Sequence, residues 1–169
     1  MNTSQAISNR DMAAIFFNMA TLLKGQPNAN PYRVAAYERA GKAMMGLRKE
    51  AREILGEKER VAFGRWRHIG DRLHAKIGEM TTSGDLAQFG EFLQTVPVYV
   101  ADIVRGVPGI GPGFAERAHV ALEVASKEDL VRAARDGRLQ QVRGFGATRT
   151  ARIASLPLPG DAMQMAFPF

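Results

Sequence analysis

The chain has 169 residues, and 46% of them are apolar, so it can bury a core as one domain or as two small ones. The absence of cysteine excludes disulfides, thiolate metal sites and a cysteine nucleophile, and only three histidines are present, which argues against a zinc cluster. A net charge of +6 predicts a polyanionic partner, of which nucleic acid is the commonest.

No stretch approaches the roughly 18 consecutive apolar residues that a membrane-spanning helix needs. Residues 1–10 are polar and lack the apolar core of a signal peptide. We therefore expect a cytoplasmic protein with no membrane partner.

The first half of the sequence has the pattern of short amphipathic helices. Ser8 is placed to begin a helix that ends at Gly25, and Asn30 followed by Pro31 predicts the start of a second helix. The stretch 48–60 alternates acids and bases, which is typical of a solvated helix rather than of a binding surface.

The second half continues in the same way. A helix is expected after Gly70, an amphipathic helix over 86–93, and another that Ser126 opens and Gly137 closes. No run of residues alternates as a strand does. The sequence therefore predicts an all-α protein of eight or nine short helices.

The turn-forming stretch 81–84 predicts a boundary between two small subdomains. We expect a first domain over 1–83, a second over 84–155, and an irregular tail over 156–169. The tail contains three prolines and no clear period. Packing against the domain or disorder is favoured for it over a partner-docking peptide.

A glycine-rich turn between two expected helices occurs three times. The fullest copy is Gly106-Val107-Pro108-Gly109-Ile110-Gly111-Pro112-Gly113, and Val142-Arg143-Gly144-Phe145-Gly146 repeats its core. A degenerate copy, Trp66-Arg67-His68-Ile69-Gly70, has His68 in place of a glycine. Glycine permits tight turns and lets a strand approach the backbone closely, and the apolar residue between the glycines is expected to tuck between the helices.

A helix that begins after such a turn exposes backbone N–H groups at its positive end, which can hold a phosphate oxygen. Six residues beyond the last glycine, each copy has a basic residue, Lys76, Arg117 or Arg152, which suits a second phosphate contact. Such contacts read no base sequence. The predicted DNA-binding residues are Gly109, Gly111, Gly113, Arg117, Arg143, Gly144, Gly146, Arg149 and Arg152. A lone turn of this kind would merely join helices, but three in a basic all-α chain favour phosphate binding.

These features together resemble the N-terminal part of family X DNA polymerases, a lyase-like helical domain followed by helix-hairpin-helix modules. The segment Asn30-Pro31-Tyr32-Arg33-Val34-Ala35-Ala36-Tyr37-Glu38-Arg39-Ala40 is similar to that family's Asn-Pro-Phe-Arg-x-x-Ala-Tyr-x-x-Ala. Gly137-Arg138-Leu139 before the third turn is similar to the bacterial members. The resemblance implies three helix-hairpin-helix motifs, of which the first is degenerate, and it covers most of residues 9–153.

The family continues into a nucleotidyltransferase palm with metal-binding aspartates. Here Asp161 is the only acid after Asp136, and the palm's Gly-Ser motif is not found. We therefore expect no polymerase activity from this chain by itself and no metal site.

The resemblance places Lys76 where the family's lyase domain has the lysine that forms a Schiff base with a 5′-deoxyribose phosphate. It also places Arg33 and Arg72 at positions that hold the 5′-phosphate, and Tyr37 at a position that lines the same pocket. The alternative is that Lys76 only contacts phosphate, as arginines stand at the equivalent positions of the other two copies.

The sequence thus predicts non-sequence-specific binding to nicked, gapped or single-stranded DNA, in DNA repair. The second hypothesis is that the chain is a 5′-deoxyribose phosphate lyase. The third is that it is an interaction scaffold that recruits a separate repair protein. No cofactor is required. The resemblance implies, as an option, a monovalent cation held by backbone carbonyls of the hairpins.

Overall fold

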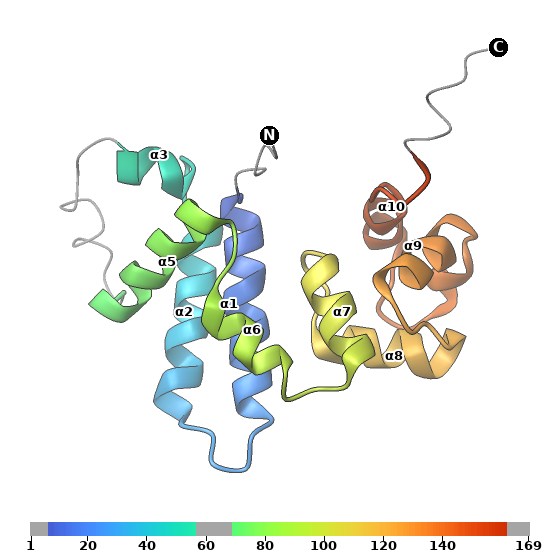
Figure 1. Cartoon of the computed structure of the whole chain (residues 1–169), viewed down its shortest axis with the longest axis horizontal. Coiled ribbons are helices and arrows are strands. Elements are labelled where there is room, and N and C mark those ends of the chain that lie inside the picture. Colours follow the sequence, from blue (N-terminus) through green and yellow to red (C-terminus); the bar gives the residue numbers. More distant parts are fainter. Residues whose placement is uncertain (1–6, 57–68, 162–169) are drawn as a thin grey trace. The chain divides into compact units, whose positions relative to one another are not determined.

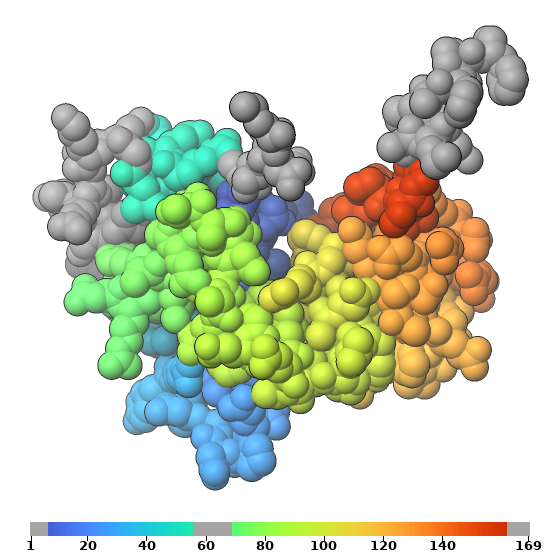
Figure 2. Space-filling view, viewed as in Figure 1, coloured from blue at the N-terminus to red at the C-terminus, as the bar shows by residue number. Residues whose placement is uncertain are grey.

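A computed structural model of the chain describes residues 7–56 and 69–161. These residues form nine α-helices and one short 3-10 helix, with no strand among them. The predicted all-α fold is confirmed. The described residues gather into two compact units that divide between Val96 and Pro97, the blue-to-green and the yellow-to-red parts of Figures 1 and 2.

The first unit is built on an antiparallel helix pair, α1 and α2 (Figure 1). Ser8 accepts a hydrogen bond from the Asp11 N–H and so caps α1, and Asn30 accepts from the N–H groups of Tyr32 and Arg33 and so caps α2. Both starts are as predicted, because a side-chain oxygen satisfies N–H groups that the first helical turn leaves unpaired. The helices of this unit are α1 (Asn9–Lys24), α2 (Pro31–Gly46), α3 (Ala51–Gly56), α5 (Asp71–Ser83) and α6 (Ala87–Leu93).

The core of the first unit is apolar and includes several methionines, among them Met12, Met19, Met44 and Met80, none of which is exposed. Unbranched methionine side chains fill irregular gaps between helices that cross at different angles. Met45 follows the buried Met44 in the sequence but is 58% exposed, because neighbouring residues on a helix point about 100° apart.

The second unit contains α7 (Val98–Gly106), α8 (Pro112–Leu122), α9 (Lys127–Arg135), the 3-10 helix η1 (Arg138–Gln141) and α10 (Ala147–Ala154). Ile110 and Phe145, the apolar residues inside the two glycine-rich turns, are fully or almost fully buried in its core. Ser126 caps α9 by accepting a hydrogen bond from the Asp129 N–H, as predicted. The turns are therefore anchored from within the unit.

The boundary between the units differs from the predicted one at residues 81–84. Helix α6 follows that stretch and contacts α1, and its buried residues Phe89 and Phe92 belong to the first unit. Gly84 lies just beyond α5 with a φ of 78°, so it ends a helix without ending a unit. Turn residues mark where an element stops, but only packing decides which core the next element joins.

Two predictions concern residues that lie outside the described ranges. The degenerate turn falls mostly within 57–68, and of its residues only Ile69 and Gly70 are described. The last eight residues of the tail, 162–169, also lie outside. The described part of the tail is held by Arg135, whose guanidinium donates to the Ala154 and Leu156 carbonyls and to the Asp161 carboxylate.

Candidate functional site

The two fully described glycine-rich turns have the same backbone geometry. The Ile110 N–H donates to the Val107 carbonyl at 3.1 Å, and the Phe145 N–H donates to the Val142 carbonyl at 3.0 Å. The glycine before each donor has positive φ, 80° at Gly109 and 95° at Gly144. A four-residue turn with positive φ at its third residue requires glycine there. The sequence repeat is thus a repeat of structure.

The last glycine of each copy begins a helix in the same way. Gly70, Gly111 and Gly146 have extended backbones and are the N-caps of α5, α8 and α10. None of the three helix starts has a side-chain capping bond. N–H groups in the first turn of each helix are therefore available to a ligand at the positive end of that helix.

The two turns are covered reciprocally by side chains. Arg152, from the helix after the second described turn, donates through Nη2 to the Pro108 carbonyl of the first turn at 3.0 Å. A Cβ at Gly109 would lie 2.7 Å from that same nitrogen. In the other direction, a Cβ at Gly144 would lie 2.9 Å from the Phe114 ring and 3.4 Å from Arg117 Nη2. The basic residues that were predicted as phosphate contacts thus also brace the opposite turn.

Phe114 organises the arginines and was not identified from the sequence as a site residue. The guanidinium carbons of Arg117 and Arg149 lie 4.4 Å and 4.2 Å from its ring centroid. Its ring meets that of Phe145 edge to face, with centroids 5.3 Å apart. Arg149 also donates to the Gly144 carbonyl. Stacking on one ring fixes two positive charges beside the turns without neutralising them.

Hydrogen bonding limits where a cation could bind at these turns. The Pro108 and Gly144 carbonyls each accept a hydrogen bond from a guanidinium. A monovalent cation at either oxygen would meet a fixed positive charge, so these two carbonyls do not fit the cation that the family resemblance implies. Among the described residues, no group of three or more histidines and acids could hold a metal ion.

A second candidate site lies in the first unit, in a pocket of about 770 Å³ between α2, α5 and α6. The four residues that the resemblance selected, Arg33, Tyr37, Arg72 and Lys76, all line it. Sequence reasoning did not identify Tyr32, Glu79 and Gln88, which line it as well. Gln88 could not have been found, because nothing local predicts that α6 folds back on α2.

The pocket wall is held by aromatic contacts. The Tyr37 hydroxyl donates to Gln88 Oε1 at 2.9 Å, and its ring stacks with that of Phe16 at 6.2 Å between centroids. The Arg33 guanidinium carbon lies 5.8 Å from the Tyr37 ring centroid and 5.6 Å from that of Phe92. These contacts fix a cation at the edge of the pocket.

The pKa of the Lys76 amine lies below its ordinary value. Burial, the largest cause, lowers the pKa of Lys76, and the nearby charges of Arg33 and Arg72 act in the same direction. Glu79 and Glu91 oppose this by raising the pKa. The amine is only partly buried, so it stays accessible to a ligand in the pocket.

Comparison with known proteins gives no family assignment: no model of a protein family matches the sequence, and no curated protein matches it significantly. In the described part of the chain, no helix is both long and apolar enough to cross a membrane.

Proposed function

We propose that this chain binds nicked, gapped or single-stranded DNA through backbone phosphates, without sequence specificity, in DNA repair. The observation that carries the proposal is the repeated turn. Two equal turns, with Gly111 and Gly146 at their ends, each begin a helix that no side chain caps. Arg117 and Arg149 stack on the Phe114 ring beside the second of these turns, and Arg152 lies against the first. This arrangement suits consecutive phosphates of one strand.

Gly113 offers the sharpest test of this proposal. A Cβ there would meet no heavy atom within 4 Å, so Gly113→Ala leaves the fold intact. If a phosphate approaches the start of α8 closely, the added methyl group will intrude on it, and we expect affinity for a single-stranded oligonucleotide to fall about fivefold to tenfold.

The matched control is Gly46→Ala, at another helical glycine with open space, which should leave DNA affinity unchanged. Fluorescence anisotropy with a labelled oligonucleotide of mixed sequence gives both affinities. Equal affinities of the two variants and wild type would show that DNA does not contact this turn.

The Lys76 pocket favours a second function, 5′-deoxyribose phosphate lyase activity. Arg33 and Arg72 suit the 5′-phosphate because guanidinium groups donate paired hydrogen bonds to phosphate oxygens. The neutral amine of Lys76 would attack C1′ of the opened sugar, and loss of water gives an imine. The imine acidifies the C2′ proton, and its removal expels the phosphate on C3′, which breaks the strand at that carbon.

Borohydride reduces such an imine to a stable covalent adduct, so borohydride trapping tests the proposed lyase activity. A duplex with a 5′-deoxyribose phosphate at a gap should be trapped by wild type and by Lys42→Ala, which alters an exposed lysine of α2. Lys76→Ala and Lys76→Arg should give no adduct at equal DNA occupancy. An adduct that persists in both Lys76 variants would show that another amine of the protein forms the imine.

A further inference from the structure

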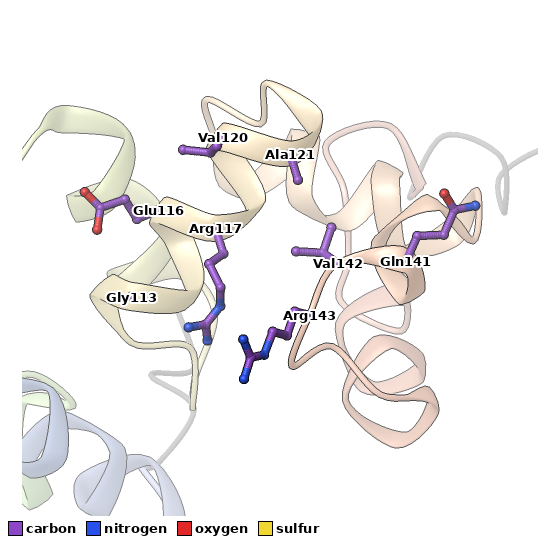
Figure 3. A pocket seen from close by; sticks show the side chains of 8 residues that line it. All are labelled: Gly113, Glu116, Arg117, Val120, Ala121, Gln141, Val142 and Arg143. Atoms are coloured by element: carbon purple, nitrogen blue, oxygen red, sulfur yellow. The ribbon is translucent and has the colours of Figure 1, made fainter.

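A pocket of about 490 Å³ lies in the second unit between α8 and the segment that leads into the second described turn. Figure 3 shows the guanidinium groups of Arg117 and Arg143 side by side at one end of it. Val120 and Ala121 of α8 lie towards the other end, and Val142 faces them from across the gap. The pocket therefore has a cationic end and an apolar end.

Among the residues that the structure describes, the two guanidinium groups have no acidic partner. Neither arginine takes part in the ion pairs found, which involve Arg132, Arg135 and Arg138. Glu116, the acid that lines the pocket, points away from the gap in Figure 3. Two like charges held together without a counterion repel each other, and an anion between them removes that cost. The cationic end therefore suits an anion that can accept hydrogen bonds from two guanidinium groups.

The apolar end narrows the chemistry of the ligand. Val120 is 79% exposed, and Ala121 beside it is exposed too, although the same helix buries Ala115 and Ala118. The volume falls within the roughly 300–1,000 Å³ of small-molecule sites, and an apolar wall beside a few polar groups is their usual composition. A bare phosphate would leave this wall exposed, whereas a phosphate attached to a sugar and a base would cover it.

We propose that this pocket holds the terminal nucleotide of a DNA strand, with its phosphate monoester between Arg117 and Arg143 and its sugar and base against Val120, Ala121 and Val142. The proposal rests on the proposed DNA binding and adds strand-end recognition to it. A terminal monoester carries about −1.5 to −2 charges and so matches two guanidiniums, whereas an internal diester carries one.

A free mononucleotide has the same chemistry as a strand end. The strand end is favoured because Gly113 and Arg143, which belong to the proposed phosphate-binding turns, also line the pocket. The end of a DNA strand that is bound along the two turns would therefore lie at the pocket.

The test compares single-stranded oligonucleotides of one sequence that carry a 5′-phosphate, a 3′-phosphate or no terminal phosphate, each with an internal label, and thymidine 5′-monophosphate as competitor. We expect one phosphorylated end to bind about tenfold more tightly than the unphosphorylated strand. Arg143→Gln and Val120→Glu should abolish that preference. Arg132→Gln, which removes the same charge from an exposed ion pair of the same unit, should preserve it.

The outcomes separate this inference from the proposal on which it rests. If all three oligonucleotides bind equally, or if Arg143→Gln weakens all three alike, strand-end recognition is wrong and general DNA binding stands. If none binds at low salt, the proposed function fails as well. If the mononucleotide competes at the same concentration as the phosphorylated strand, the pocket is a free-nucleotide site and the strand end is not its ligand.

Discussion

Asn9 joins the start of α1 to the start of α3 through three hydrogen bonds. Its side-chain oxygen accepts from the Ala51 N–H at 2.7 Å, and its side-chain nitrogen donates to the Lys49 carbonyl at 2.8 Å. Its backbone N–H donates to Glu50 Oε2 at 2.8 Å. The asparagine is 8% exposed and Ala51 is fully buried, so water cannot replace these bonds.

Replacing Asn9 with alanine should therefore destabilise the first unit by about 2–3 kcal/mol, because it leaves a buried N–H and a carbonyl without partners. Hydrogen exchange of the α1 and α2 amides measures this loss locally. Asn28→Ala, in an exposed loop, is the control. A loss for Asn9→Ala no larger than that of the control would mean that water satisfies the freed groups.

Asp161 fixes the described end of the tail to α9. Its carboxylate lies 2.7 Å from Arg135 Nη2 and accepts from the Leu158 N–H at 2.8 Å. The hydrogen bond from Arg135, and then that from Leu158, lowers the pKa of Asp161 to about 2. A carboxyl group whose pKa falls on folding stabilises the folded state above its unfolded pKa and loses that contribution as the pH falls through its folded pKa.

We therefore expect the segment 155–161 to stay attached at neutral pH and to detach as the pH falls from about 4 to about 2. The amide signal of Leu158, followed by NMR in a pH titration, should report the release. In Arg135→Gln the signal should already have its detached position at pH 7. A Leu158 signal that does not respond to either change would show that this ion pair does not hold the segment.

At the scale of the elements, α1 and α2 pack closely because Gly41 has no side chain. A Cβ at Gly41 would lie 2.8 Å from atoms of the Phe17 ring, whereas a Cβ at Gly46, at the end of the same helix, would meet nothing within 4 Å. One glycine is needed for packing and the other is not.

Gly41→Ala should destabilise the helix pair by about 1–3 kcal/mol through overpacking. Gly46→Ala should be neutral or stabilising by up to about 1 kcal/mol, because alanine is the better helix former. Amide hydrogen exchange in α1 gives both values. Equal stabilities would indicate that Phe17 moves aside freely.

Local chemistry made much of the fold predictable. Ser8, Asn30 and Ser126 cap helices as their residue types indicate, and the repeated glycines predicted two turns of equal backbone. Contacts between residues that are far apart in the sequence were not predictable. Arg152 reaches Pro108 and Tyr37 reaches Gln88 only because of how the helices pack, and the same applies to the assignment of α6 to the first unit.

At the scale of the whole molecule, each unit has its own cationic feature. The first unit has a pocket around a lysine of lowered pKa, and the second has two turns with stacked arginines. The resemblance selected the residues of the pocket correctly as neighbours, but their role as a lyase site stays a prediction. The bracing of each turn by the other's arginine has no sequence signal, because spacing alone cannot distinguish a phosphate contact from an internal one.

The central claim is phosphate-mediated DNA binding, and the measurement that tests it most directly is the salt dependence of affinity. Binding of wild type to a gapped duplex and to a single strand is measured from 50 to 300 mM salt. If three or more phosphates are contacted, log K will fall linearly with log salt concentration, with a slope of about −2 or steeper. An affinity that does not change with salt, or no binding at 50 mM, would contradict the claim.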